Sequence, residues 1–204
     1  MKLYFAAGAC SLAPHIVLRE LALPFELVRV DNRSKRTADG RDFLSINPKG
    51  YVAALALDDG QVLSEGPAIL QFLADLRPQA GLAPSHGMAR ARLQEWLAFL
   101  NSEVHAGCAP LFDASLPAAA HAHFRARLER RLGYLDGALG DRRHLLGRDF
   151  GVADAYLFTL LGWLPRFGIE LAQWPALAAF QARVGMRAAV RAALAAEVRA
   201  APVP

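Results

Sequence analysis

The chain has 204 residues, 54% of them hydrophobic and 21% charged, so it is long and apolar enough for a buried core and is not intrinsically disordered. Its two cysteines exclude a disulfide scaffold and favour a reducing, cytoplasmic setting. The net charge of +4 comes from scattered arginines, which argues against nucleic-acid binding, and no charge-free apolar run is long enough to predict a membrane span.

The first eighty residues mix strand and helix patterns. We predict a strand over Lys2–Ala6, a helix over Leu12–Leu21 and a second strand over Phe25–Val30, where apolar and polar residues alternate. The polar stretch 31–43 is expected to hold a short helix.

A hairpin and a third helix follow. Two apolar runs flank Asp58-Asp59-Gly60, and Asp-Gly is typical of tight hairpin turns. Ser64 is a candidate N-cap for a helix that begins at Glu65. The predicted order is β-α-β-α-β-β-α.

Beyond this point the pattern is helical. Residues 78–86 contain two Pro and one Gly and read as a linker. We therefore predict an α/β domain over 1–77, the linker over 78–86 and an all-helical domain over 87–204. Its expected helices cover Gly87–Phe112, Leu116–Leu139, Val152–Leu164, Pro175–Val184 and Arg187–Glu197.

Cys10 and Ser11 lie where the first strand meets the first helix. A thiol over a helix N-terminus favours the thiolate, so we expect Cys10 to be accessible and to have a low pKa. The alternative for Cys10 is a small buried apolar residue, and for Ser11 a plain N-cap.

Three further positions are candidates for binding. The helix start at Glu65-Gly66 offers amides to a carboxylate and a carboxylate to an ammonium group, although it also fits an ordinary helix start. Lys35 is either a ligand or a surface charge. His105 and Cys108 share a helix face, but two ligands do not make a zinc site, so we predict no metal.

Taken together, several segments carry a resemblance that spans nearly the whole chain. They are MKLYFAAGACSLAPHIVLRE, INPKG, LSEGPAILQFLADL, EWLAFLNSEVH, PLF and VADAYLFTL. In this order and spacing the chain resembles the glutathione transferases, most closely the bacterial beta class. The resemblance implies a thioredoxin-like domain followed by a helical domain, and a cytosolic homodimer.

The resemblance also implies a glutathione site in the first domain. Cys10 matches the class cysteine beside the glutathione sulfur. Lys35 would contact the glycine end of the tripeptide, and the backbone of Val52 would pair with its cysteinyl unit. Glu65 and Gly66 would bind the γ-glutamyl end.

The helical domain contributes a second group by the same resemblance. Ser102, Glu103 and His105 match the segment that borders the site, and His105 is the family's candidate for assisting at the sulfur. Asp154 matches a buried aspartate that organises the start of the core helix.

Three departures from the family are visible. Ala98 stands where the family often has an Asn near the ligand, which would weaken one polar contact. Ala53 stands where the family has a cis-proline, and since a non-prolyl cis bond costs about 2.5–4 kcal/mol we expect the Val52–Ala53 bond to be trans. Gly151 replaces the usual Ser or Thr N-cap, at an expected cost of a few tenths of a kcal/mol.

The leading hypothesis is conjugation of reduced glutathione, as co-substrate, to a small electrophilic apolar molecule, with Cys10, His105 and Ser11 as catalytic candidates. One alternative makes Cys10 the nucleophile of glutathione-dependent thiol–disulfide exchange or peroxide reduction. Another is a non-catalytic binding protein that has kept the fold. Fold alone does not identify the second substrate.

Overall fold

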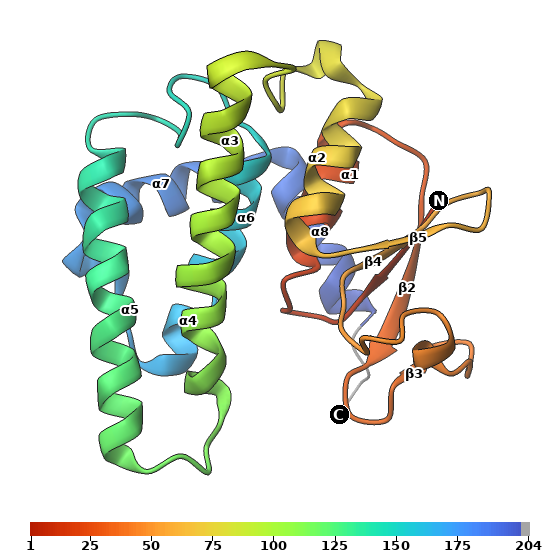
Figure 1. The fold of residues 1–204 in the computed structure, drawn as a ribbon, viewed down its shortest axis with the longest axis horizontal. Helices are drawn as coiled ribbons and strands as arrows, with labels where there is room; N and C mark the ends of the chain where they lie inside the picture. Colours follow the sequence, from red (N-terminus) through yellow and green to blue (C-terminus); the bar gives the residue numbers. More distant parts are fainter. Residues whose placement is uncertain (201–204) are drawn as a thin grey trace. The chain divides into compact units, whose positions relative to one another are not determined.

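The computed structural model describes residues 1–200 and divides into two compact units (Figure 1). The first unit contains Met1–Ala80 and the described residues from Met186 onward, and the second contains Gly81–Gly185. The boundary after Ala80 lies inside the predicted linker. None of the helices among residues 1–200 is long and apolar enough to span a membrane.

The first unit is built on a five-stranded sheet. Its strands are β1 (Lys2–Phe5), β2 (Glu26–Asp31), β3 (Arg36–Thr37), β4 (Ala54–Ala56) and β5 (Val62–Ser64), in the spatial order β3-β2-β1-β4-β5. β1 and β2 are parallel and joined through α1 (Leu12–Glu20), whereas β4 runs antiparallel to β1. This confirms the predicted thioredoxin-like sheet domain.

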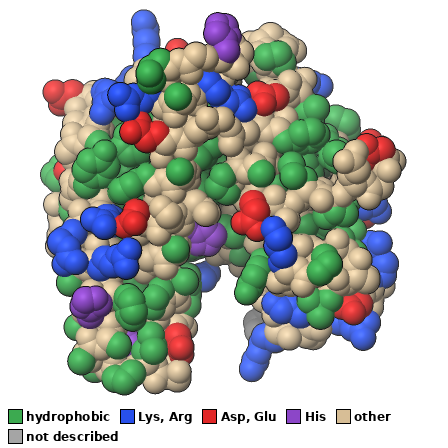
Figure 2. Space-filling view, viewed as in Figure 1, with side chains coloured by type: hydrophobic (Ala, Val, Ile, Leu, Met, Phe, Trp, Pro, Cys, Tyr) green, Lys and Arg blue, Asp and Glu red, His purple; other side chains and the backbone are tan. Residues whose placement is uncertain are grey.

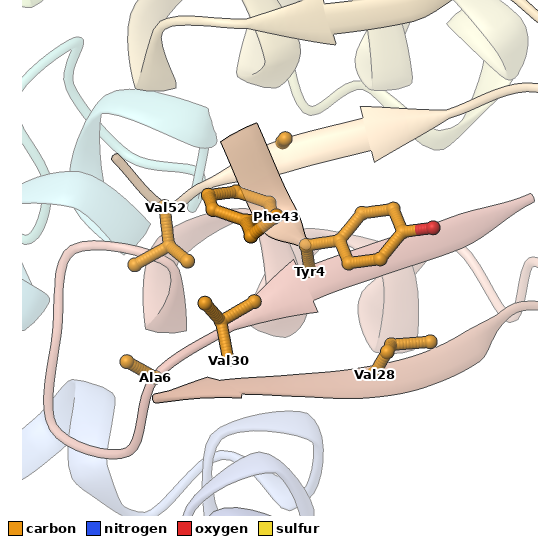
Figure 3. Packing of buried hydrophobic residues seen from close by; sticks show 7 residues of the cluster. Tyr4, Ala6, Val28, Val30, Phe43 and Val52 are labelled. Atoms are coloured by element: carbon orange, nitrogen blue, oxygen red, sulfur yellow. The ribbon is translucent and has the colours of Figure 1, made fainter. Parts of the chain in front are cut away.

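The two faces of the sheet follow the alternation of β1. Leu3 and Phe5 are fully buried on one face, while Tyr4 points to the other. On the face of Tyr4 a separate cluster forms, to which the polar stretch contributes a single large side chain, Phe43 (Figure 3). Val52 packs in the same cluster, which places this site candidate at the edge of a buried core.

The prediction of a short α-helix within residues 31–43 is wrong. The stretch forms β3 and then a 3-10 turn over Phe43–Ser45. The Asp31 carboxylate accepts hydrogen bonds from the backbone N–H groups of Arg33 and Ser34, both at 2.8 Å, and these bonds hold its pKa below the usual range. Such side-chain-to-backbone bonds favour turns over helix.

The hairpin and the helix after it form as predicted. β4 and β5 pair antiparallel around the Asp58-Asp59-Gly60 turn. Helix α2 (Gly66–Leu76) begins one residue later than expected, and the predicted N-cap Ser64 is wrong, because Ser64 ends β5 and Glu65 occupies the N-cap position. Pro67 in the first turn fits because its missing N–H would have had no partner there. α2 packs against α1.

The second unit is helical. Its elements are α3 (Gly87–Phe99), a wider π-type turn (Leu100–His105), α4 (Ala106–Cys108), a 3-10 turn (Ala109–Phe112), α5 (Ala118–Leu139), α6 (Val152–Leu161) and α7 (Pro175–Gly185). The predicted helix 87–112 is therefore helical over its whole length, but its hydrogen-bonding pattern changes from α to π, back to α and then to 3-10. All ten residues of α6 are buried, as its apolar sequence predicts.

Helix α6 begins on a buried carboxylate. Asp154 is 1% exposed and accepts hydrogen bonds from the backbone N–H groups of Gly151 at 2.8 Å and Leu145 at 2.9 Å. The organising role expected of Asp154 fits this arrangement.

The last helix, α8 (Ala188–Arg199), belongs to the first unit. It packs against α1, and the Arg187 guanidinium donates to both carboxylate oxygens of Glu20 at 2.6 and 3.0 Å (Figure 1). Sequence reasoning placed this segment in the helical domain 87–204, because a helix pattern does not reveal which unit its apolar face covers.

Candidate active site

Cys10 lies in the loop between β1 and α1, two residues before the helix begins. The thiol is half-buried, and its Sγ–H donates to the carbonyl of Val52 at 3.2 Å. Burial raises the pKa of Cys10 to about 11, and the negative charge of Glu65 adds to the rise. Hydrogen bonds from backbone N–H groups lower the pKa of Cys10, but by less than burial raises it. The expectation of a low-pKa thiol is therefore wrong for this structure.

The reactivity of Cys10 should follow this pKa. We expect its rate of alkylation by iodoacetamide to keep rising above about pH 9, beyond the midpoint of about 8.5 for a free thiol. The buried Cys108, whose pKa burial raises to about 12, should contribute little, and a Cys108→Ala variant controls for it. A rate that levels off below about pH 8 would contradict this prediction.

Ser11 is fully buried. Its Oγ accepts a hydrogen bond from the Ala6 N–H and donates one to the Ala6 carbonyl, each at 3.3 Å. Ser11 occupies the N-cap position of α1, as that alternative expected, but its side chain makes no capping bond to the helix. These bonds close the base of the loop, and a catalytic role for the hydroxyl does not fit its burial.

The Val52–Ala53 peptide bond is cis, so the expectation of a trans bond is wrong. Both residues are buried, and the next residue, Ala54, is already paired with Tyr4 in the ladder between β1 and β4. The geometry of this segment therefore comes from its packing and strand register rather than from a prolyl ring.

Glu65 lies at the start of α2 with a positive φ of 70°. Its carboxylate is exposed and forms an ion pair with the Lys49 ammonium at 2.7 Å, and the same ammonium donates to Ser64 Oγ at 3.1 Å. Gly66 is the first helical residue. The predicted helix start is thus present, and Lys49, which lies within the INPKG segment and had no assigned role, contacts both Ser64 and Glu65 there.

Lys35 also belongs to the first unit. Its ammonium donates to the Gly50 carbonyl at 2.9 Å and lies 5.9 Å from the centre of the Tyr51 ring. Lys35 is therefore not simply a solvated surface charge, because its side chain is half-buried and its ammonium is held by the Gly50 carbonyl.

In the second unit, His105 ends the π-type turn and contacts the core helix α6. Its Nδ1 lies 2.6 Å from the hydroxyl of Tyr156, which donates to Asn101 Oδ1 at 2.9 Å. Since the hydroxyl proton points to Asn101, the imidazole must donate from Nδ1, and this assigns Nε2 as the acceptor of the neutral ring. π-type turns are frequent at functional sites.

Ser102 and Glu103 do not share the surroundings of His105. Ser102 is exposed, while the Glu103 carboxylate accepts from Arg131 of α5 at 2.6 Å and from Arg127 at 3.5 Å. The hydrogen bond from Arg131 is the main reason that the pKa of Glu103 is lowered.

A row of aromatic side chains continues from His105. The centre of its ring lies 5.1 Å from that of Trp163, which lies 5.5 Å from Phe112, and Phe112 lies 4.8 Å from Phe167. Phe112 is 47% exposed. Trp163 and Phe167 are not predicted from the sequence as site residues, because single aromatic residues in a helical pattern usually indicate core packing.

Among residues 1–200, no three His, Cys, Asp or Glu side chains gather as metal ligands would. Cys108 is a buried free thiol at the end of α4.

Comparisons with known proteins give the same assignment along the chain. Residues 7–76 match the family described as glutathione S-transferase, N-terminal domain, and residues 99–187 match the corresponding C-terminal domain. Glutathione S-transferase GstA of Escherichia coli is 45% identical over 198 residues, which cover 97% of this chain and 98% of that protein.

Solved structures agree in fold. A sphingomonad glutathione S-transferase complexed with glutathione has a TM-score of 0.94 at 47% identity, covering 97% of this chain and 99% of that one. The beta class enzyme of Sphingomonas chungbukensis has a TM-score of 0.93 at 45% identity, covering 97% and 98%. The chain belongs to the glutathione S-transferase family.

Proposed function

We propose that this glutathione transferase binds reduced glutathione on the unit that carries Cys10 and conjugates it, through a bond from the glutathione sulfur, to a small, apolar electrophile. The observation that carries the proposal is the contact between Cys10 Sγ and the Val52 carbonyl at 3.2 Å. It brings a thiol to the backbone group that, by the family resemblance, pairs with the cysteinyl unit of the tripeptide.

In this proposal each charged group of glutathione binds a group of opposite charge or a hydrogen-bond donor of the first unit. Glu65 and the first amides of α2, at Gly66, receive the ammonium and carboxylate of the γ-glutamyl end. Lys49 orients the Glu65 carboxylate, and Lys35 binds the glycine carboxylate.

Cys10 then acts as a donor rather than as a nucleophile. With a pKa of about 11 its thiol stays protonated at neutral pH. When the tripeptide takes over the Val52 carbonyl, the released S–H donates to the glutathione sulfur and stabilises its thiolate. Lowering the glutathione pKa by about two units corresponds to about 2.7 kcal/mol.

We assign the second role at the sulfur to His105, following the family resemblance. Tyr156 and Asn101 hold its ring with the proton on Nδ1, which makes Nε2 the basic atom. The aromatic row of His105, Trp163, Phe112 and Phe167 supports an apolar, aromatic co-substrate.

The test uses one preparation for three measurements: calorimetry with reduced glutathione, turnover of a chlorinated nitrobenzene, and reduction of a mixed disulfide. Binding with conjugation supports the proposal. Binding with disulfide reduction alone selects the exchange reaction at Cys10, and binding without either reaction selects a non-catalytic protein. Absence of binding contradicts all three.

We further expect a homodimer. On the second unit the aromatic rings of Trp96, Phe99 and Tyr134 contact one another, and Tyr134 is 57% exposed. Figure 2 shows hydrophobic side chains at the surface over α3 and α5. Light scattering at micromolar concentration should give twice the chain mass of 22.1 kDa, and Tyr134→Glu should shift it toward the monomer. A wild-type monomer would refute the prediction.

We place the reaction in the cytoplasm. Both cysteines are free thiols, and a reducing compartment maintains that state for Cys10 as well as for glutathione.

A further inference from the structure

A buried carboxylate of the last helix reaches the loop that carries Cys10. Glu197 of α8 is 3% exposed, and its Oε2 accepts a hydrogen bond from the backbone N–H of Gly8 at 3.2 Å. Gly8 lies two residues before Cys10. A buried carboxylate is costly unless it accepts hydrogen bonds. The hydrogen-bond donors around Glu197 therefore fix where its carboxylate lies.

The other oxygen of Glu197 is held by a short chain of side chains. Its Oε1 lies 3.1 Å from Nδ1 of the fully buried His15, and Arg19 Nε donates to His15 Nε2 at 2.9 Å. A guanidinium can only donate, so Nε2 accepts and the His15 proton lies on Nδ1, directed at Glu197. His15 is thus a neutral connector between the Arg19 cation and the carboxylate.

The loop from Ala6 to Ser11 is held at two places. The Ser11 hydroxyl bonds to both backbone groups of Ala6 at the base, and Glu197 binds Gly8 near the tip. Cys10 lies between these two anchors. One anchor is local in sequence, whereas the other comes from the far end of the chain.

We propose that Glu197 is a positioning residue for Cys10, which it holds in place through the backbone of Gly8. His15 and Arg19 orient the carboxylate for this contact. The effect on glutathione binding rests on the function proposed above, whereas the effect on the Cys10 thiol itself does not.

Glu197→Gln tests this role with little change in shape. The amide has one acceptor oxygen, so it cannot accept from both His15 and Gly8, and its NH₂ group faces a donor. We expect the loop to loosen, the alkylation of Cys10 to speed up by about threefold or more, and the KM for glutathione to rise by about tenfold, as for the loss of a hydrogen bond to a charged group.

Arg187→Met is the matched control. It breaks the ion pair with Glu20, which joins the same two helices without touching the loop. This variant should lower Tm while leaving Cys10 alkylation and the glutathione KM at wild-type values.

A merely structural Glu197 would behave like Arg187. If Glu197→Gln lowers Tm but leaves both the alkylation rate and the KM unchanged, the proposal is overturned. If that variant does not fold, hydrogen exchange of the wild-type Gly8 amide decides: we expect protection of about a hundredfold or more, and exchange at the unprotected rate overturns the proposal. Because alkylation needs no glutathione, a wild-type protein that fails to bind it would contradict only the proposed function.

Discussion

Replacing Asp154 with Ala should lower the free energy of unfolding by about 4 kcal/mol, the largest loss of stability that we expect from one side chain. The carboxylate is 1% exposed and accepts from two backbone N–H groups, those of Leu145 and Gly151. Truncation leaves both donors buried without this partner, at about 1–3 kcal/mol each, and removes a negative charge from the start of α6.

Urea denaturation and thermal melting measure this loss. For a chain of this length about 4 kcal/mol corresponds to a fall in Tm of roughly 8–16 °C. Asp154→Asn is the control, because its amide oxygen still accepts one of the two bonds, and it should lose less than the Ala variant. A loss below about 1 kcal/mol for Asp154→Ala would show that other groups satisfy these donors.

The regular elements were predictable because their apolar residues repeat with the period of a strand or a helix. β1, β2, α1 and the hairpin of β4 and β5 follow this pattern closely. The stretch 31–43 did not, since its conformation depends on single hydrogen bonds. Asp42, for example, caps the 3-10 turn by accepting from the Leu44 N–H at 3.0 Å.

The location of Cys10 was predictable, but its chemistry was not. A helix start after the first strand places the thiol in the right loop. Its pKa depends instead on how deeply the loop is packed and on the charge of Glu65, which tertiary structure alone determines. At Val52–Ala53 the family resemblance pointed to a cis bond, but the energetic cost of a cis bond without proline favoured the trans form, and the structure has the cis form.

Gly151 lies in a close contact between two segments that are distant in sequence. As a missing N-cap it looks like a small loss, yet a Cβ at this position would lie 2.9 Å from the carbonyl oxygen of Leu82. That carbonyl accepts a hydrogen bond from the Val152 N–H at 2.9 Å. Glycine therefore permits a close approach between segments distant in sequence, and the Ser or Thr that the family resemblance led us to expect would not fit without a shift.

Contacts between distant segments also explain what was missed around the candidate site. Tyr156 and Asn101 orient His105, and Lys49 pairs with Glu65. Each of these residues has an ordinary surface or core role by sequence alone. Only the fold shows that Tyr156, in a helix of mostly apolar residues, presents its hydroxyl to an imidazole.

Cys10→Ala should separate the two reactions that the family resemblance leaves open. Exchange with a disulfide needs a sulfur at this position, so it should be abolished. Conjugation needs only a donor to the glutathione thiolate, and losing one hydrogen bond to a charged group should reduce kcat/KM by about ten- to a hundredfold. The remaining activity would come from His105 and the backbone.

Cys108→Ala is the matched control for this variant. It removes the other thiol of the chain, which is fully buried in the second unit, and should leave both reactions near wild-type rates. Stopped-flow conjugation and mixed-disulfide reduction on the three proteins give the comparison. If Cys10→Ala abolishes conjugation as completely as exchange, the loss of one hydrogen bond cannot account for the result, and the donor role assigned to the protonated thiol of Cys10 is wrong.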